Sequence, residues 1–209
     1  MIYDRTIGIF PTPISFYRLD RDFTNQEYNF IIDQKKDVFR NTTDGVAGNL
    51  ATENAKILNH VIMHDLKNEL MKCLYSYYEN VLSTSDKIQP LITQSWLNFT
   101  EIGQNHHNHY HPNSFVSGVL YIEADERYDT IVFDRDIRDT FILNRSDNHQ
   151  FNAHTWIFPV KKYDIILFPS YLKHNVPIKN NGDLRISLAF NSFFKGTIGN
   201  PSVFTELTL

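Results

Sequence analysis

Four of the nine histidines of this chain fall within seven residues, in the stretch His106-His107-Asn108-His109-Tyr110-His111-Pro112. The cluster comes directly before an alternating run over residues 117–122, Ser-Gly-Val-Leu-Tyr-Ile. Side chains alternate along a strand, so a His-x-His pair that enters a strand has both imidazoles on one face. Neutral imidazole is the commonest protein ligand of first-row divalent metals. The pattern therefore predicts part of a metal site, and His174, near the end of a second strand-like segment, is the best candidate for its third ligand.

Length and composition limit the class of protein. A chain of 209 residues with 42% hydrophobic residues can bury one sizeable core. The net charge of −4 argues against a dedicated nucleic-acid-binding surface. The single cysteine, Cys73, cannot form an intramolecular disulfide and lies in an amphipathic helical pattern, so we expect an inert thiol in a reducing compartment. No secretory leader or membrane-length apolar run is present, and we expect a soluble cytoplasmic protein with no membrane partner.

The first part of the chain predicts an extended segment and two helices. Residues 7–17 contain two prolines and suit an edge strand or a strap across a sheet. Thr24 or Asn25 can cap a helix that ends before the turn residues 41–45. A longer helix is expected over residues 57–82, with an apolar stripe that would pack against a sheet, formed by Val61, Leu66, Leu70, Leu74, Tyr77 and Val81.

From residue 92 onward the pattern is strand-like. Six strands are expected, at residues 95–100, 117–122, 130–133, 155–159, 164–168 and 184–190. Many short strands after two helices predict a mainly β fold, an antiparallel barrel or sandwich with helices on one side. We expect one domain over residues 1–209, with a support region at 1–91 and the β core at 92–209. The polar segment 135–153 is long enough to be a lid that contacts the substrate.

Histidines outside the cluster lack a ligand pattern. His60 and His64 are four residues apart, but Val61 follows His60, so the glutamate of a His-Glu-x-x-His zinc protease is missing. We expect these two to be solvated helix residues. His149 and His154 lie in a polar stretch without ligand spacing and receive the same interpretation.

A second polar pattern lies in the last predicted strand. Arg185, Ser187 and Asn191 are expected on one face, opposite a face formed by Ile186, Leu188 and Phe190. A buried arginine needs an anion, and a carboxylate held by two hydrogen bonds is its best partner. No acidic residue of the chain is obviously placed for it, so a ligand carboxylate is one interpretation. An edge-strand arginine paired with a surface acid is the other, and periodicity alone leaves both open.

The order His-x-His, strand, His174, Arg185, Ser187 resembles that of the Fe(II)- and 2-oxoglutarate-dependent oxygenases of the double-stranded β-helix, or jelly-roll, class. More closely, the chain resembles a family of such oxygenases from phages and marine bacteria, which would place it in the host cytoplasm if it is phage-encoded. The early Phe10-Pro11-Thr12-Pro13 is similar to the start of that family, so the resemblance spans nearly the whole chain. The other segments that carry it are Trp96-Leu97-Asn98, Gly103, His109-Tyr110-His111-Pro112, Ser117-Gly118-Val119-Leu120-Tyr121, Leu167-Phe168-Pro169-Ser170, His174 and Arg185-Ile186-Ser187-Leu188-Ala189-Phe190-Asn191.

The resemblance implies a jelly-roll barrel packed against two or more helices, and a dioxygenase that consumes O2 and 2-oxoglutarate, hydroxylates a substrate and releases succinate and CO2. His109 and His174 would be histidine ligands of Fe(II), and Arg185 would bind the distal carboxylate of 2-oxoglutarate. Ser187 and Tyr121 would assist by hydrogen bonds. The remaining positions that match co-substrate contacts in some relatives are Asn98 and Asn191.

His111 departs from the usual pattern of the class, which has Asp or Glu at this position. If His111 is the third ligand, three neutral imidazoles leave the metal with a higher net charge than two histidines and a carboxylate would. Asp134 is an acid from a neighbouring predicted strand that could complete the site instead, although a surface or structural role is the simpler interpretation.

Two other functions remain open at this point. The spacing of Gly103, His109 and His111 overlaps half of a cupin pattern, and a three-histidine cupin would need no 2-oxoglutarate; Phe115 and Val116 stand where its glutamate would be. A non-catalytic jelly-roll binding module is the second alternative. The substrate could be a small molecule, a protein or a nucleobase, and the proline-rich start could serve a homodimer.

Overall fold

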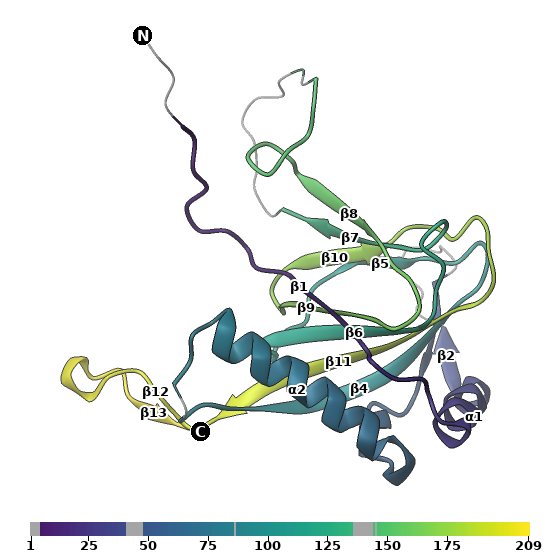
Figure 1. The fold of residues 1–209 in the computed structure, drawn as a ribbon, viewed down its shortest axis with the longest axis horizontal. Coiled ribbons are helices and arrows are strands. Elements are labelled where there is room, and N and C mark those ends of the chain that lie inside the picture. Colours follow the sequence, from purple (N-terminus) through teal and green to yellow (C-terminus); the bar gives the residue numbers. More distant parts are fainter. Residues whose placement is uncertain (1–4, 41–47, 86, 136–143, 145) are drawn as a thin grey trace.

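The computed structural model describes residues 5–40, 48–85, 87–135, 144 and 146–209 (Figure 1). Its named strands all pair antiparallel, in two main sheets and a small hairpin. The larger sheet has the order β1 (Ser15–Arg18), β9 (Asp164–Pro169), β6 (Val116–Glu123), β11 (Arg185–Lys195), β4 (Gln89–Thr100), β3 (Leu50–Thr52) and β2 (Val38–Arg40). The smaller sheet has the order β5 (His106–His109), β10 (Lys173–Val176), β7 (Thr130–Asp134) and β8 (Thr155–Pro159). The predicted mainly β chain is confirmed.

The chain passes repeatedly between the two sheets from β4 to β11. β4, β6, β9 and β11 lie in the larger sheet, while β5, β7, β8 and β10 lie in the smaller one. Eight strands that alternate in this way, with the orders β9-β6-β11-β4 and β5-β10-β7-β8, have the arrangement of a double-sheet jelly roll. Residues far apart in sequence, from the ends of β5, β10 and β11, are thereby brought into the space between the sheets.

The period-two pattern of the central strands divides their side chains between two hydrophobic layers. Leu120 and Ile122 of β6 belong to the core beneath the helices, whereas Val119 and Tyr121 belong to a second cluster between the sheets. Only glycine fits at position 118, because a Cβ there would lie 2.2 Å from the ring of Phe190. One face of the larger sheet therefore packs against the helical layer, and the other faces the smaller sheet and is free to form a site.

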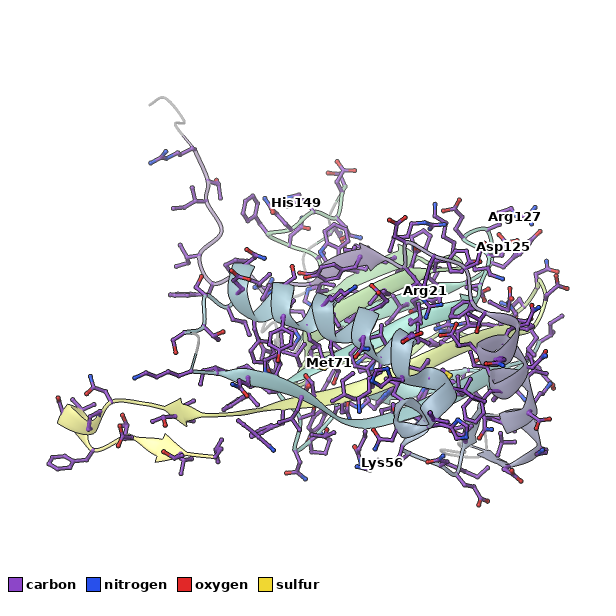
Figure 2. All side chains as sticks on the ribbon, turned by 60° about the horizontal axis from the view of Figure 1, so that its bottom comes forward. Arg21, Lys56, Met71, Asp125, Arg127 and His149 are labelled. Atoms are coloured by element: carbon purple, nitrogen blue, oxygen red, sulfur yellow. The ribbon has the colours of Figure 1, made fainter. Side chains whose placement is uncertain are left out.

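The helical layer consists of α1 (Asn25–Asp33) and α2 (His64–Asn80), and α2 lies across the larger sheet with Met71 near its middle (Figure 2). The predicted stripe is present in α2, where Leu66, Leu70, Leu74 and Tyr77 are buried. Its start was misplaced. Residues Ile57–Asn59 and Val61–Met63 form two short 3₁₀ turns, because His60 between them has an extended backbone and its Nδ1 accepts the Ile62 N–H. Val61 is consequently 81% exposed rather than packed.

Shorter elements differ more from the sequence-based expectation. β1 pairs with β9 at the edge of the larger sheet, which agrees with the predicted edge strand, but it starts only at Ser15. The strands β2, β3, β5 and β10 were not predicted, nor was the terminal hairpin of β12 (Thr197–Ile198) and β13 (Leu207–Thr208), which projects from the sheets (Figures 1 and 2). The predicted turn at 41–45 lies outside the described residues, as do residues 136–143 and 145 of the predicted lid. In the described part of the chain, no helix has the length and apolar character needed to cross a membrane.

Candidate active site

Three of the predicted ligands converge between the sheets. His109 is the last residue of β5 and pairs with His174 of β10 across the antiparallel ladder. His111 lies just after β5, where its N–H donates to the Ser170 carbonyl oxygen at 2.9 Å. One ring nitrogen from each of these histidines lies within 4.8 Å of the others. The His-x-His pair thus leaves a strand rather than entering one, and His174 belongs to its own strand rather than to the end of β9.

Hydrogen bonds to the backbone fix two of the three rings. The Nδ1–H of His109 donates to the carbonyl oxygen of His107 at 2.8 Å, and that of His174 to the carbonyl oxygen of Leu172 at 3.0 Å. A carbonyl can only accept, so each Nδ1 carries the proton and each Nε2 presents a lone pair. Metal-binding histidines are held in the same manner in proteins generally.

The protonation states suit metal binding. Burial, together with the neighbouring imidazole of His109, lowers the pKa of His111 to about 4 and that of His174 to about 3. Burial also lowers the pKa of His109. All three rings are therefore neutral at pH 7 and able to donate a lone pair. The donor set fits a first-row divalent ion bound by three imidazoles.

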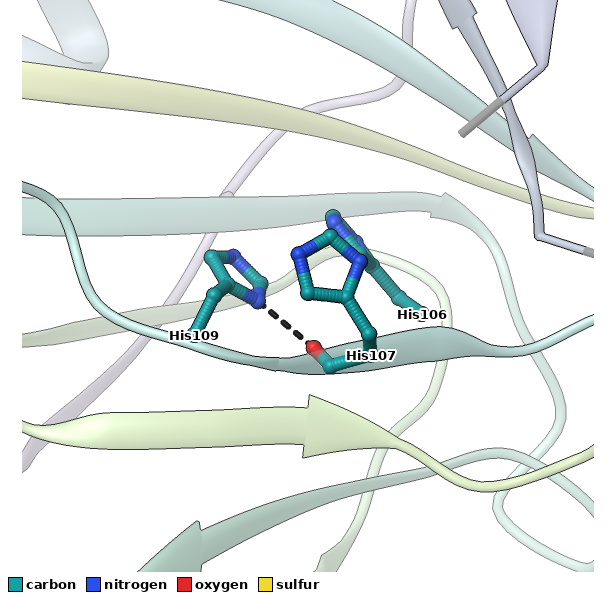
Figure 3. A group of neighbouring side chains, drawn as sticks. All are labelled: His106, His107 and His109. Carbon is teal, nitrogen blue, oxygen red and sulfur yellow. Dashed lines mark hydrogen bonds between the residues drawn. The ribbon is translucent and has the colours of Figure 1, made fainter. Parts of the chain in front are cut away.

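The other histidines of the cluster also lie beside the site. The ring of His106 stacks on that of His109 with centroids 4.3 Å apart, and His106 lines the same cavity (Figure 3). Ring nitrogens of His106, His107 and His109 also approach within 4.8 Å of one another. His106 faces the cavity because the ladder of β5 with β10 is irregular between His174 and Val176, which turns this ring inward.

Asp134 does not belong to the histidine group. Its Oδ2 accepts hydrogen bonds from the side-chain amides of Asn108 and Asn175, and its Oδ1 accepts one from the Thr155 hydroxyl. These partners come from the other three strands of the smaller sheet, so Asp134 links all four strands. Among the described residues, the group around His174 contains histidines only.

The cavity beside the histidines extends to Arg185 at the start of β11. Arg185 is 3% exposed, its Nη1 donates to the Thr130 carbonyl oxygen at 2.9 Å, and its Nε has no hydrogen-bond partner in the described structure. No ion pair to this guanidinium exists within the described residues. A buried cation that faces a cavity and has no carboxylate partner is suited to bind an anion.

Tyr121 and Ser187 lie beside this guanidinium. They are opposite each other in the β6–β11 ladder and both line the cavity. The Tyr121 ring lies 5.1 Å from the Arg185 Cζ, and its hydroxyl is a second buried group without a partner. Burial raises the pKa of Tyr121 to about 12, so the hydroxyl remains a hydrogen-bond donor.

Asn98 lines the cavity on the β4 side, as predicted, and Asn49 was missed. The Asn49 Nδ2 donates to the Asn98 Oδ1 at 2.9 Å, and both side chains face the cavity. Asn49 immediately precedes the short strand β3, in a polar segment whose sequence carries no periodic signal. Only the pairing of β3 with β4 brings it to Asn98.

Asn191 is the one predicted site residue that the structure keeps away from the cavity. Its Oδ1 accepts a hydrogen bond from the Ser117 hydroxyl and its Nδ2 donates to Gln94. The cavity lining from β11 consists of Arg185, Ser187 and Ala189.

Residues 94–191 match the sequence profile of a family described as "Putative 2OG-Fe(II) oxygenase". This is the region of the site. All the predicted site residues fall within the matched segment, from Asn98 to Asn191. The match indicates a 2-oxoglutarate- and Fe(II)-dependent oxygenase.

Similar solved structures share the fold at low sequence identity. The epimerase SnoN of nogalamycin biosynthesis, described as non-heme and α-ketoglutarate-dependent, is 8% identical with a TM-score of 0.61, over 87% of this chain and 78% of SnoN. A 2OG-Fe(II) oxygenase family protein from Burkholderia pseudomallei is 12% identical with a TM-score of 0.56, over 85% of this chain and 84% of that one. HygX from Streptomyces hygroscopicus, solved with nickel, 2-oxoglutarate and hygromycin B, is 11% identical with a TM-score of 0.54, over 87% of this chain and 82% of HygX. No curated protein matched the sequence.

Proposed function

We propose that this oxygenase hydroxylates its substrate at a metal ion held by His109, His111 and His174, with 2-oxoglutarate as co-substrate. The metal, when bound, supplies the site at which O2 and the keto acid react to give succinate, CO2 and the oxidant. The chain's own residues determine where each reactant lies. SnoN, a protein of similar fold, was crystallised in complex with Fe³⁺ and α-ketoglutarate, and this supports the proposal.

Arg185 is the residue to which we assign the distal carboxylate of 2-oxoglutarate. Its unpaired Nε and the unpaired hydroxyl of Tyr121 are buried donors in one cavity, and an acceptor that satisfies both removes the cost of leaving them desolvated. Ser187 adds a hydroxyl on the same wall. Thr130, whose carbonyl accepts from Nη1, keeps the guanidinium plane fixed while the anion binds. This pair of orphaned donors is the single observation that carries the proposal.

His111 takes the position at which the class usually has an acid. With three neutral ligands the protein adds no negative charge to the divalent ion, so the two charges of bound 2-oxoglutarate are the first anions in the site. We therefore expect 2-oxoglutarate to bind the metal-loaded protein more tightly than the metal-free protein. By the same coupling, the metal should bind the protein–2-oxoglutarate complex more tightly than the protein alone. The Trp96 ring, 5.7 Å from that of His111, covers one side of this ligand.

The proposal is tested by adding Fe(II) and then 2-oxoglutarate to the purified protein without oxygen. A chelated keto acid gives a visible metal-to-ligand charge-transfer band, and we expect that band in the wild type. A protein that bound Fe(II) stoichiometrically but gave no band and no 2-oxoglutarate binding would contradict the proposal. That outcome would favour the three-histidine cupin-type enzyme, for which the all-histidine donor set is the specific observation.

We also propose that residues 1–209 act as one domain in which the two sheets close into the jelly-roll barrel. The shared cavity, lined from β4, β6 and β11 of one sheet and from β5, β7 and β10 of the other, supports this arrangement. Homodimer formation through the N-terminal segment remains a proposal, and light scattering of the purified chain tests it.

A further inference from the structure

A second cavity adjoins the histidine group at His111. It has a volume of about 330 Å³, and among the described residues His111 is the only one that lines both cavities. Its walls come from the segment between β5 and β6, from the β9–β10 turn, and from α2. A molecule in the second cavity would therefore lie beside a proposed metal ligand.

The lining of this cavity is apolar and carries no charged side chain. It is formed by Pro13, Tyr77, Leu82, Tyr110, His111, Pro112, Asn113, Ser114, Phe115, Val116, Pro169 and Tyr171. Three of its aromatic rings are exposed: Tyr110 by 52%, Phe115 by 43% and Tyr171 by 68%. Exposed rings gathered around a hollow beside a reactive centre are typical of a ligand site.

Packing holds several of these walls in place. The Phe115 ring meets that of Phe194 edge-on at 5.1 Å and that of Tyr78 at 5.9 Å. The Tyr77 hydroxyl donates to the Pro13 carbonyl oxygen at 3.0 Å, which ties α2 to the N-terminal segment. A ring that is exposed yet fixed loses little freedom when a ligand packs on it, so the cavity is preformed.

We propose that this second cavity binds the substrate, and that the substrate presents an uncharged, apolar ring to it. The proposal rests on the proposed oxygenase function and specifies its substrate class. A charged group in this cavity would lose hydration without gaining a counter-charge, because none of the lining side chains is ionised at pH 7. An uncharged ring instead packs against the rings of Tyr110, Phe115 and Tyr171.

Two fluorescent probes that differ only in charge test this. N-phenylnaphthylamine is neutral, and its sulfonated analogue, anilinonaphthalene sulfonate, has the same rings and one negative charge. We expect the neutral probe to bind the full-length protein at one saturable site and about tenfold more tightly than the anionic one. Equal affinity for the two probes would overturn the proposal.

A matched pair of variants locates the binding. Tyr171→Ala removes an exposed ring of the cavity and should weaken the neutral probe about tenfold. Tyr75→Ala removes an exposed tyrosine of α2 that does not line the cavity, and should leave binding unchanged. Loss of affinity in both variants, or in neither, would place the probe elsewhere and contradict the proposal.

The connection to the metal group is read from Co(II) bound in place of Fe(II). Because His111 lines both cavities, the neutral probe should change the visible Co(II) spectrum of the wild type, and Tyr171→Ala should need about tenfold more probe. Binding of 2-oxoglutarate is measured on the same samples. If the protein binds 2-oxoglutarate but does not prefer the neutral probe, only the proposed substrate class is contradicted. If it prefers the neutral probe but does not bind 2-oxoglutarate, the proposed function is contradicted.

Discussion

His109 and His174 are opposite each other in the β5–β10 ladder, and each donates its Nδ1–H to the carbonyl oxygen two residues earlier in its own strand or turn. The two short segments, 65 residues apart in the chain, thus hold their imidazoles by the same local contact. Both Nε2 atoms consequently point into the space that His111 also enters. A metal ion would find two ligands already oriented before it binds, which lowers the entropic cost of assembling the site.

Replacement of His174 tests the metal group. His174→Ala removes one of two preoriented ligands, and we expect it to abolish stoichiometric Fe(II) binding, measured by anaerobic titration. His149→Ala is a matched control, since His149 is exposed and its Nδ1 accepts only the Phe151 N–H. Full Fe(II) binding by His174→Ala would remove His174 from the ligand set.

His111 permits a substitution that adds rather than removes a ligand charge. His111→Asp restores the carboxylate that the class usually has, and a negative ligand lowers the net charge of the site. We expect His111→Asp to bind Fe(II) at least as tightly as the wild type, and His111→Ala to bind it more than about tenfold more weakly. Equal Fe(II) affinity in the alanine variant and the wild type would show that His111 is not a ligand.

Replacement of Arg185 should weaken the binding of 2-oxoglutarate and leave the binding of the metal unchanged. Loss of a charge-assisted pair costs about 1.5–3 kcal/mol, so Arg185→Ala should weaken 2-oxoglutarate binding about 10- to 100-fold while Fe(II) affinity is unchanged. Arg127→Ala, which removes an exposed arginine paired with Asp125, serves as control. Calorimetry of 2-oxoglutarate binding to the Fe(II) or Ni(II) form measures both. Unchanged co-substrate affinity in Arg185→Ala would refute the assignment.

Asn49 should act through Asn98. Its amide donates to the Asn98 Oδ1 and so fixes the direction in which the Asn98 amide presents its own Nδ2. Asn49→Asp keeps the shape but removes the donor, and we expect the KM for 2-oxoglutarate to rise about fivefold, as for the loss of about 1 kcal/mol. Metal affinity should stay near that of the wild type, whereas the carboxylate placed at this buried position should lower the thermal stability. An exposed counterpart, Asn68→Asp on α2, should change none of these values.

The features that could be predicted are those in which local pattern and global structure agree. Leu120 and Ile122 alternate with Val119 and Tyr121, and this period of two was sufficient to place β6 in a sheet with two different faces. The face of β11 that carries Arg185 and Ser187 could be predicted for the same reason. Whether its partner was a ligand or a surface acid could not, because that depends on which side chains from other strands reach it.

The features that could not be predicted depend on long-range pairing. β10 has only four residues. The sequence alone therefore indicates that its His174 belongs to the end of the previous strand, and only the pairing with β5 shows that it lies in a strand of its own. The inward position of His106 results from an irregularity of that same ladder. Asn191 has the correct period for the cavity face, but the register of β11 with β4 shifts between Asn191 and Ser192, and Ser117 and Gln94 occupy both ends of its amide. No local sequence signal carries these contacts.

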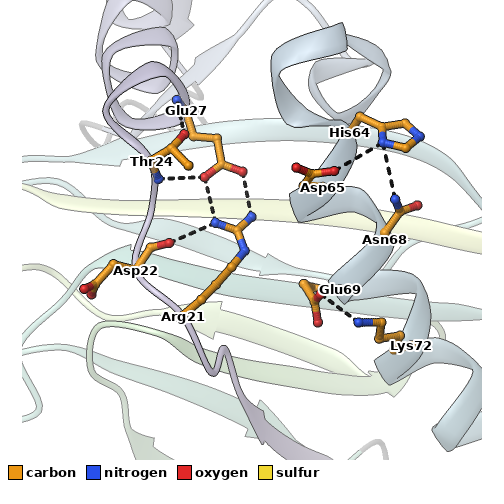
Figure 4. A network of polar contacts seen from close by, with 9 residues as sticks. All are labelled: Arg21, Asp22, Thr24, Glu27, His64, Asp65, Asn68, Glu69 and Lys72. Carbon is orange, nitrogen blue, oxygen red and sulfur yellow. Dashed lines mark hydrogen bonds and ion pairs between the residues drawn. The ribbon is translucent and has the colours of Figure 1, made fainter.

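The support region makes a prediction that is independent of the site. Glu27 is 2% exposed, accepts hydrogen bonds from both terminal nitrogens of Arg21, and closes a capping box with Thr24 at the start of α1 (Figure 4). Glu27→Ala leaves Arg21 without its partner and removes the cap contact, so we expect a loss of about 3–5 kcal/mol in the free energy of unfolding. Glu69→Ala breaks an exposed pair with Lys72 in the same view and should cost less than about 1 kcal/mol.

The stabilisation that the Glu27 carboxylate provides depends on pH with a definite sign. Burial acts to raise the pKa of Glu27, but the hydrogen bonds from Arg21 and Thr24 outweigh it, and the pKa lies below its ordinary value of 4.5. The folded chain therefore holds the proton less tightly than the unfolded chain, and the stabilisation is complete above pH 4.5 and lost as the pH falls through the folded pKa. Urea unfolding of the wild type and of Glu27→Gln should give curves that differ most at neutral pH and converge in acid. A difference that stayed constant with pH would show that the carboxylate charge at Glu27 contributes nothing, and that the variant acts only through packing.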